Sequence, residues 1–150
     1  MSVINVFLHF VWATKNRTPF LITPEIRKSV WQHIETNAKT KDIYVLETSG
    51  HKDHCHCIVS LSKDMNISKI AQLLKGECSY WINKSGLITE HFREEKFDWQ
   101  EDYFVESISP HLLQSVRNYL YIQEEHHKTH SFEEEYQNFF KEFKEGNLPI

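Results

Sequence analysis

The chain has 150 residues, 40% of them hydrophobic and 13% aromatic, which fits one globular domain with its own core. No apolar run approaches the roughly 20 residues of a membrane helix, so we expect no membrane partner. No secretory signal is recognisable and three cysteines argue against a disulfide framework, so we expect a cytoplasmic protein. The net charge of −4 gives no sign of a nucleic-acid partner, although residues 1–90 carry 11 Lys and Arg against 8 Asp and Glu, and residues 91–150 carry 6 against 13.

The first half of the chain alternates strand and helix signals. Residues 3–13 are rich in β-branched and aromatic side chains and predict a strand. A capping threonine and a proline at Thr23-Pro24 then mark a helix start. Residues 43–48 predict a second strand, ended by Ser49-Gly50, and residues 55–61 predict a third. These two strands are close enough in sequence to form a hairpin, with its turn near residues 50–53.

The second half continues with a helix over residues 67–83, which Ser85-Gly86 ends. Residues 87–102 are expected to form an ordered loop, and residues 103–108 a fourth strand. Ser109-Pro110 is expected to cap a helix running to about residue 127, with an apolar stripe of Leu112, Leu113, Val116 and Leu120. A capping box at residues 131–134 predicts a last, acidic helix.

The order of elements, β-α-β-β-α-β followed by two helices, is typical of the ferredoxin-like split βαβ arrangement. We therefore predict an α+β fold, an antiparallel sheet with helices on one face, plus C-terminal helices. Residues 1–130 are expected to form the functional domain, with residues 131–150 as an acidic helix and tail of the same domain.

Two histidines, His54 and His56, begin the third predicted strand. Side chains alternate between the two faces of a strand, so both imidazoles point the same way and form half of a metal site. Cys55 and Cys57 face the opposite side, which excludes a zinc cluster made of all four residues. Taken alone, a His-x-His on a strand is more often structural than metal-binding.

Tyr119 and Gln123 are four residues apart on the helix that follows the fourth strand. They lie on one helix face, about 6 Å apart along the axis, and border its apolar stripe, so both are expected to face the sheet. In isolation, such a tyrosine is more often a core residue than a nucleophile, and such a glutamine is usually a surface residue.

Several segments in order resemble the single-tyrosine HUH (His-hydrophobic-His) transposases of the small insertion-sequence and REP-associated type. The similarity extends over Leu8–Arg17, Asp53–His56, Leu73–Gly76, Trp99-Gln100 with Tyr103, and Tyr119 to His127. The chain departs from the family pattern at Cys55, usually a larger hydrophobic residue, and at Asp102, usually glycine. Residues 1–130 are accordingly interpreted as an HUH catalytic domain.

The resemblance implies a site and a mechanism. His54, His56 and Gln123 would bind a divalent metal, Mg²⁺ or Mn²⁺, that polarises the scissile phosphate. Tyr119 would attack single-stranded DNA beside a hairpin, leaving a 5′-phosphotyrosine link and a free 3′-hydroxyl for strand transfer. Family members also tend to form dimers in which the tyrosine helix acts in trans. Because two imidazoles and an amide suit softer ions better than Mg²⁺, the site without DNA is expected to bind metal weakly and to accept other transition metals.

Five further residues are candidates for DNA contact. Lys15, Arg17 and Lys75 would bind phosphates, or else are ordinary solvated charges. Trp99 and Tyr103 would stack on bases, or else pack in the core. Two other functions remain open at this point: a non-catalytic DNA or RNA hairpin-binding relative of the same fold, and a metal-dependent phosphodiesterase that uses water.

Overall fold

The structure, a computed structural model, describes residues 1–122. Gln123 and the predicted acidic helix and tail of residues 131–150 lie outside the described residues. Four strands form one sheet in the order β2-β3-β1-β4, in which every neighbouring pair is antiparallel. The strands are β1 (Phe7–Ala13), β2 (Tyr44–His51), β3 (His54–Ser60) and β4 (Phe104–Ile108). This arrangement confirms the predicted α+β fold.

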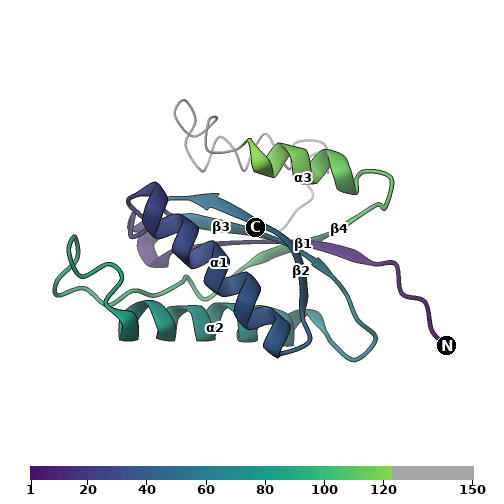
Figure 1. The fold of residues 1–150 in the computed structure, drawn as a ribbon, viewed down its shortest axis with the longest axis horizontal. Helices are drawn as coiled ribbons and strands as arrows, with labels where there is room; N and C mark the ends of the chain where they lie inside the picture. Colours follow the sequence, from purple (N-terminus) through teal and green to yellow (C-terminus); the bar gives the residue numbers. More distant parts are fainter. Residues whose placement is uncertain (123–150) are drawn as a thin grey trace.

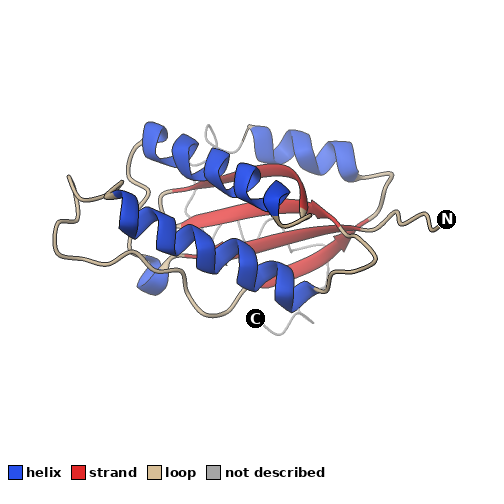
Figure 2. Ribbon diagram, turned by 60° about the horizontal axis from the view of Figure 1, so that its bottom comes forward, coloured by secondary structure: helices blue, strands red, loops and turns tan. Residues whose placement is uncertain are grey.

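Within residues 1–122, three α-helices cover the sheet, two on one face and one on the other (Figure 1). Helices α1 (Pro24–Thr40) and α2 (Ile67–Ser85) lie side by side in front of the strands in Figure 2. Helix α3 (Leu113–Tyr121) follows β4 and lies on the opposite face (Figure 1). The prediction of helices on one face therefore holds for the two helices inside the βαββαβ unit, and the sheet is covered on both sides.

The start of α1 and the end of α2 follow the capping chemistry that the sequence predicts. The hydroxyl of Thr23 accepts a hydrogen bond from the backbone N–H of Ile26 at 3.1 Å, and Pro24 occupies the first helical position. Asn66 caps α2 in the same way through Lys69 N–H at 2.9 Å. Gly86 ends α2 in the left-handed conformation, with φ of 70°.

Two apolar cores lie on the two faces of the sheet. The larger one fills the space between the sheet and helices α1 and α2, and takes alternate residues from β1 and β3. The smaller one lies under α3 and is built on Ile58, Ile108 and Leu120. Its members come from β3, β4 and α3, so α3 is held against the central part of the sheet.

Three element boundaries differ from the predicted ones by three residues or more, and the others by two residues at most. β1 begins at Phe7 and not at residue 3, because its pairing with β3 and β4 ends there and Val3 is fully exposed. β2 continues through Gly50 to His51, which leaves a tighter hairpin turn. Helix α3 begins at Leu113, since the carbonyl of Ser109 accepts from Leu112 N–H at 2.8 Å in a separate turn.

Leu112 consequently lies before the helix and is exposed, so it is not part of the apolar stripe, whereas Leu113 and Val116 do pack on the smaller core. The predicted end of the helix near residue 127 lies outside the described residues. None of the helices within residues 1–122 is long and apolar enough to span a bilayer.

Candidate active site

His54 and His56 lie on the face of the sheet that α3 covers. Along β3, Cys55 and Cys57 point into the larger core, whereas Ile58, with the parity of the histidines, belongs to the smaller core under α3. The predicted alternation is therefore confirmed, and the cysteines are separated from the histidine pair by the sheet. Both histidines are buried, and their rings are nearly perpendicular, at 83°, with centroids 5.1 Å apart.

Each histidine of the pair has a partner for its Nδ1 atom. His54 Nδ1 lies 3.0 Å from Oδ1 of Asp53, and His56 Nδ1 lies 2.9 Å from Nε2 of His9. A metal-binding histidine characteristically uses its second ring nitrogen for such an outer contact. Nε2 of each ring is therefore the nitrogen that the predicted metal site would use.

The described residues do not by themselves complete the predicted metal site. Within residues 1–122, no group of three or more His, Cys, Asp and Glu side chains is arranged to hold a metal ion. The predicted third ligand, Gln123, is the first residue beyond this segment. The histidine pair would thus account for two of the three predicted ligands.

Asp53 stays ionised beside His54. Burial raises the pKa of its carboxyl, but the hydrogen bond from His54 and the charges of His54, Arg17 and His51 lower it, and the net shift is downward. A carboxylate accepts hydrogen bonds and cannot donate them, so His54 carries a proton on Nδ1 and donates it in a hydrogen bond to Asp53. This contact fixes the His54 ring with Nε2 pointing away from Asp53.

Tyr119 is carried to the same face of the sheet by α3. Its side chain is half-buried and packs on the smaller core, which includes Ile58, two residues after His56 on β3. Next to Tyr119, the carbonyl of Leu120 accepts a hydrogen bond from the Ser49 hydroxyl at 2.8 Å. Ser49 is the β2 residue paired with His56, so the tyrosine helix is tied directly to the strand position beside the histidine pair.

Comparison with known proteins identifies the family. The model of the family described as "Transposase IS200 like" matches residues 2–125. The chain belongs to the IS200-like transposase family. Its members are DNA-cleaving enzymes, so transposase is the functional class of this chain.

Two solved structures share the fold of this transposase. A candidate transposase from Deinococcus radiodurans R1 is 19% identical, with a TM-score of 0.64, over 81% of this chain and 93% of that one. A REP-associated tyrosine transposase bound to a REP hairpin is 17% identical, with a TM-score of 0.55, over 85% of this chain and 71% of that one. No curated protein matched the chain.

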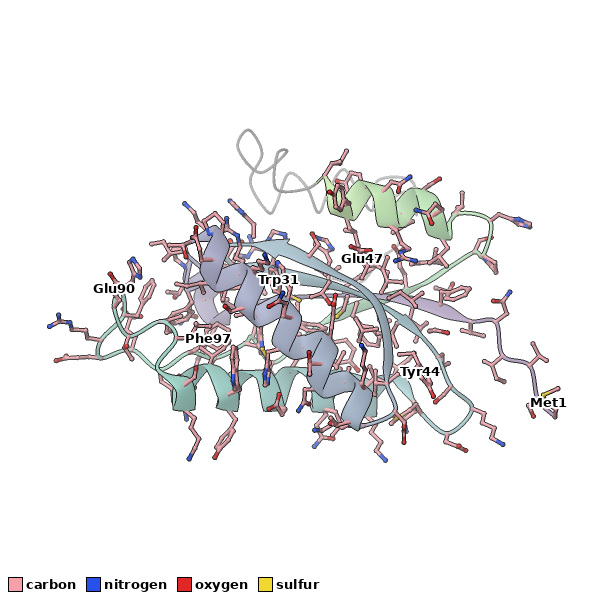
Figure 3. All side chains as sticks on the ribbon, in the orientation of Figure 1. Met1, Trp31, Tyr44, Glu47, Glu90 and Phe97 are labelled. Carbon is pink, nitrogen blue, oxygen red and sulfur yellow. The ribbon has the colours of Figure 1, made fainter. Side chains whose placement is uncertain are left out.

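A second contact anchors the tyrosine helix of the transposase. Arg117 donates to the carboxylate of Glu47 at 3.3 Å and to the carbonyl of Leu46 at 3.2 Å. Glu47 projects from β2 toward α3, as Figure 3 shows. Arg117 and Leu120 thus fix α3 over β2 at points on either side of Tyr119.

Segments that are far apart in the sequence meet at the end of the sheet near His54. The N–H of Thr14 donates to the carbonyl of Asp53 at 2.9 Å. Lys15 N–H donates to the carbonyl of Asp98, also at 2.9 Å, and Thr14 forms an isolated bridge with Trp99. The exposed side chains of Lys15 and Arg17 therefore lie on a short turn (η1, Lys15–Arg17) that is hydrogen-bonded to the strand end before the histidines.

Lys75 on α2 has extensive contacts within the chain. Its ammonium donates to the carbonyls of Gln100 and Glu101 at 2.7 Å each and to that of Asp102 at 3.4 Å. It also lies 5.5 Å from the centre of the Tyr103 ring. Burial lowers the pKa of Lys75, against the opposing effect of the neighbouring acidic side chains. Lys75 therefore holds the loop before β4, whether or not it also contacts DNA.

The two aromatic candidates differ in exposure. Trp99 is buried and makes edge contacts with Trp12 and Phe97, at centroid distances of 5.9 Å and 4.9 Å. Of the two roles that the sequence left open, core packing accounts for this ring. Tyr103 is 36% exposed and presents part of its ring at the surface.

The sequence interpretation gave no role to His9, which is fully buried on β1 between His56 and Glu106. A histidine within an otherwise apolar strand was the available signal. What it contacts could not be known without the register between β1, β3 and β4.

Proposed function

We propose that this transposase nicks single-stranded DNA beside a hairpin and transfers the cleaved strand through a covalent link to Tyr119. The observation that carries the proposal is the docking of α3 on the histidine face of the sheet, through Leu120 and Ser49, the partner of His56. It brings the tyrosine-bearing helix and the histidine pair together within one chain. An arrangement in which the helix of a partner subunit takes this place stays a prediction.

The bond changes follow from the residue types. The phenolic oxygen of Tyr119 attacks the phosphorus, and the bond from phosphorus to the 3′-oxygen breaks. The DNA that follows the nick stays attached to Tyr119 through its 5′-phosphate, and the 3′-oxygen leaves and takes up a proton. Attack by another 3′-hydroxyl on the phosphotyrosine reverses the chemistry and joins strands without an external energy source. The phenol must lose its proton during the attack, although a free tyrosine has a pKa near 10.

The histidines would serve this step as metal ligands. His54 and His56 would bind Mg²⁺ or Mn²⁺ through Nε2, together with Gln123. When bound, the cation would place positive charge beside the phosphate and stabilise the negative charge that develops on its oxygens during the attack. The chain itself supplies a dry, fixed position for the two imidazoles, because both are buried and each is held through Nδ1.

The proposed substrate is a single strand flanked by a hairpin. One of the similar structures is bound to a REP hairpin, and this chain has the same fold. Lys15 and Arg17, both exposed and near the strand end that leads to His54, are proposed to contact its phosphates. Tyr103 is proposed to stack on a base.

The test is a cleavage assay with a hairpin oligonucleotide that carries a fluorescent label at its 3′ end. With Mn²⁺ present, we expect the label to move with the protein on a denaturing gel, because Tyr119 keeps the 3′ fragment. Tyr119→Phe should abolish both the adduct and the nick. The matched control is Tyr121→Phe, since Tyr121 is on the same helix but is 80% exposed.

Two outcomes would contradict the proposal. Cleavage that survives Tyr119→Phe and leaves no adduct would indicate a phosphodiesterase that uses water. Hairpin binding without any cleavage, in the unaltered chain and with Mn²⁺ present, would indicate a non-catalytic binding protein.

A further inference from the structure

His9 is a buried polar residue at the centre of the sheet. β1 lies between β3 and β4, so a side chain on its α3 face has neighbours on both adjacent strands. His9 is opposite Glu106 in the β1–β4 register and lies next to His56 across β1 and β3. Burying an imidazole without hydrogen bonds is costly, and these two neighbours provide its contacts.

The contact between His9 and His56 has the geometry of a hydrogen bond in the plane of both rings. The two nitrogens are 2.9 Å apart, and the ring planes are within 13° of parallel. The ring centroids are nevertheless 5.1 Å apart, much farther than the nitrogens. The rings therefore meet edge to edge, and one nitrogen must donate while the other accepts.

Glu106 favours one direction for that hydrogen bond. Its carboxylate oxygen lies 3.5 Å from His9 Nδ1 and accepts only, so the proton of a neutral His9 belongs on Nδ1. His9 Nε2 then carries the lone pair and must accept from His56 Nδ1. With its proton on Nδ1, His56 has its lone pair on Nε2, the atom assigned to the metal.

We infer that His9 is a positioning residue that holds His56 in the ring orientation and tautomer required for metal coordination. The carboxylate of Asp53, the preceding residue, does the same for His54, whereas His9 acts on His56 from a strand position 47 residues earlier. The 3.5 Å contact of Glu106 is long, so its part is to bias the proton on His9, and His9 itself carries most of the effect. The inference rests on the proposed metal site, but the tautomer of His56 is a property of the chain without metal.

The test combines two measurements on the full chain. The first is a two-bond ¹H–¹⁵N correlation spectrum of the metal-free protein, which reports the tautomer of each histidine; we expect Nδ1–H for both His9 and His56. The second is titration with Mn²⁺ and Co²⁺ by calorimetry. His9→Phe, which fills the space without accepting a hydrogen bond, should weaken metal affinity by about 10- to 100-fold. His9→Gln places an amide oxygen near the position of His9 Nε2, where it can accept from His56 Nδ1, and should recover most of the lost affinity.

The chain offers a matched control in His33, which pairs with Glu77 at 2.7 Å on the other side of the sheet, between α1 and α2. His33→Phe should leave both measurements unchanged.

An Nε2–H tautomer of His56 in the unaltered chain would overturn the inference, as would His9→Phe with unchanged metal affinity. If the unaltered chain shows the expected tautomers but binds no metal, the proposed metal site fails while the hydrogen-bond direction stands. The tautomer of His56 is measured on the unaltered chain. The inference can therefore still be refuted if the His9→Phe chain does not fold.

Discussion

Gly50 shows at the residue scale how tightly the hairpin before the histidines is packed. A Cβ atom at this position would lie 2.2 Å from the carbonyl oxygen of His54 and 3.0 Å from Cα of Cys55. The obstacle is backbone and not a flexible side chain, so a larger residue must displace β3 where His54 begins it. The close approach of the two strands therefore explains why β2 continues through a glycine that the sequence indicated as its end.

We predict that Gly50→Ala destabilises the protein by about 1–3 kcal/mol, as overpacking does, and weakens Co²⁺ binding by moving His54. Urea unfolding and a Co²⁺ titration would measure the two effects. The control is Gly76→Ala on α2, where a Cβ meets nothing within 4 Å. That substitution should stabilise the helix by about 0.5–1 kcal/mol. Equal stability changes in the two variants would contradict the predicted clash.

Lys75 provides a second test at this scale. Lys75→Met keeps most of the side-chain stem but removes the donor to the carbonyls of Gln100 and Glu101. Because the site is only half-buried, we expect a loss of about 1 kcal/mol in unfolding free energy, with a change in fluorescence as Trp99 moves. Lys84→Met, which removes an ammonium 5.8 Å from the exposed Tyr80 ring, is the control and should change stability little. If the two variants are equally stable, Lys75 does not hold the loop.

At the scale of elements, α3 depends on the sheet for its position. A helix of nine residues is marginal on its own in water, so docking must supply its stability. That docking rests on one fully buried side chain, Leu120, and on the polar contacts of Arg117 and Ser49. Tyr119, the proposed nucleophile, is therefore on an element that, within residues 1–122, depends on these contacts and on the packing of Leu113 and Val116 for its placement.

We predict that Ser49→Ala lowers the rate of DNA nicking by about 10- to 100-fold, because a small displacement of the nucleophile is costly. Metal affinity should stay unchanged, since neither histidine loses a partner. Single-turnover cleavage and calorimetry would separate the two properties. Ser107→Ala, at an exposed position of β4, is the control. A matching loss of metal affinity would show that Ser49 acts through His56 and not through α3.

At the scale of the whole molecule, local patterns predicted more of the fold than of the site. The order of strands and helices along the chain follows from periodicity and turn chemistry, and the parity of β3 placed His54 and His56 on one face. The face that α3 covers was not predictable, because both faces of the strands offer apolar positions, such as Cys57 on one face of β3 and Ile58 on the other. The contact of His9 with His56 also depends on the register between strands, which no local pattern encodes.

The three cysteines report on how the whole core opens. Cys55, Cys57 and Cys78 are free and fully buried in the larger core, where β3 meets α2. Burial raises the pKa of the Cys55 thiol and of the Cys78 thiol, and only the thiolate is reactive. We therefore predict that the folded protein resists iodoacetamide at pH 8 and that all three thiols react together in urea.

Mass spectrometry of the intact chain at increasing urea concentrations would measure this. If the core is one cooperative unit, molecules with none or three modified cysteines should dominate at every concentration. Ser107→Cys adds a thiol at an exposed position of β4 and should react at once without denaturant, which shows that the reagent is active. A singly modified population that peptide mapping assigns to Cys78 would instead mean that α2 detaches from the sheet before β3 opens. In that case the strand that carries the histidines would outlast the helix layer that covers its other face.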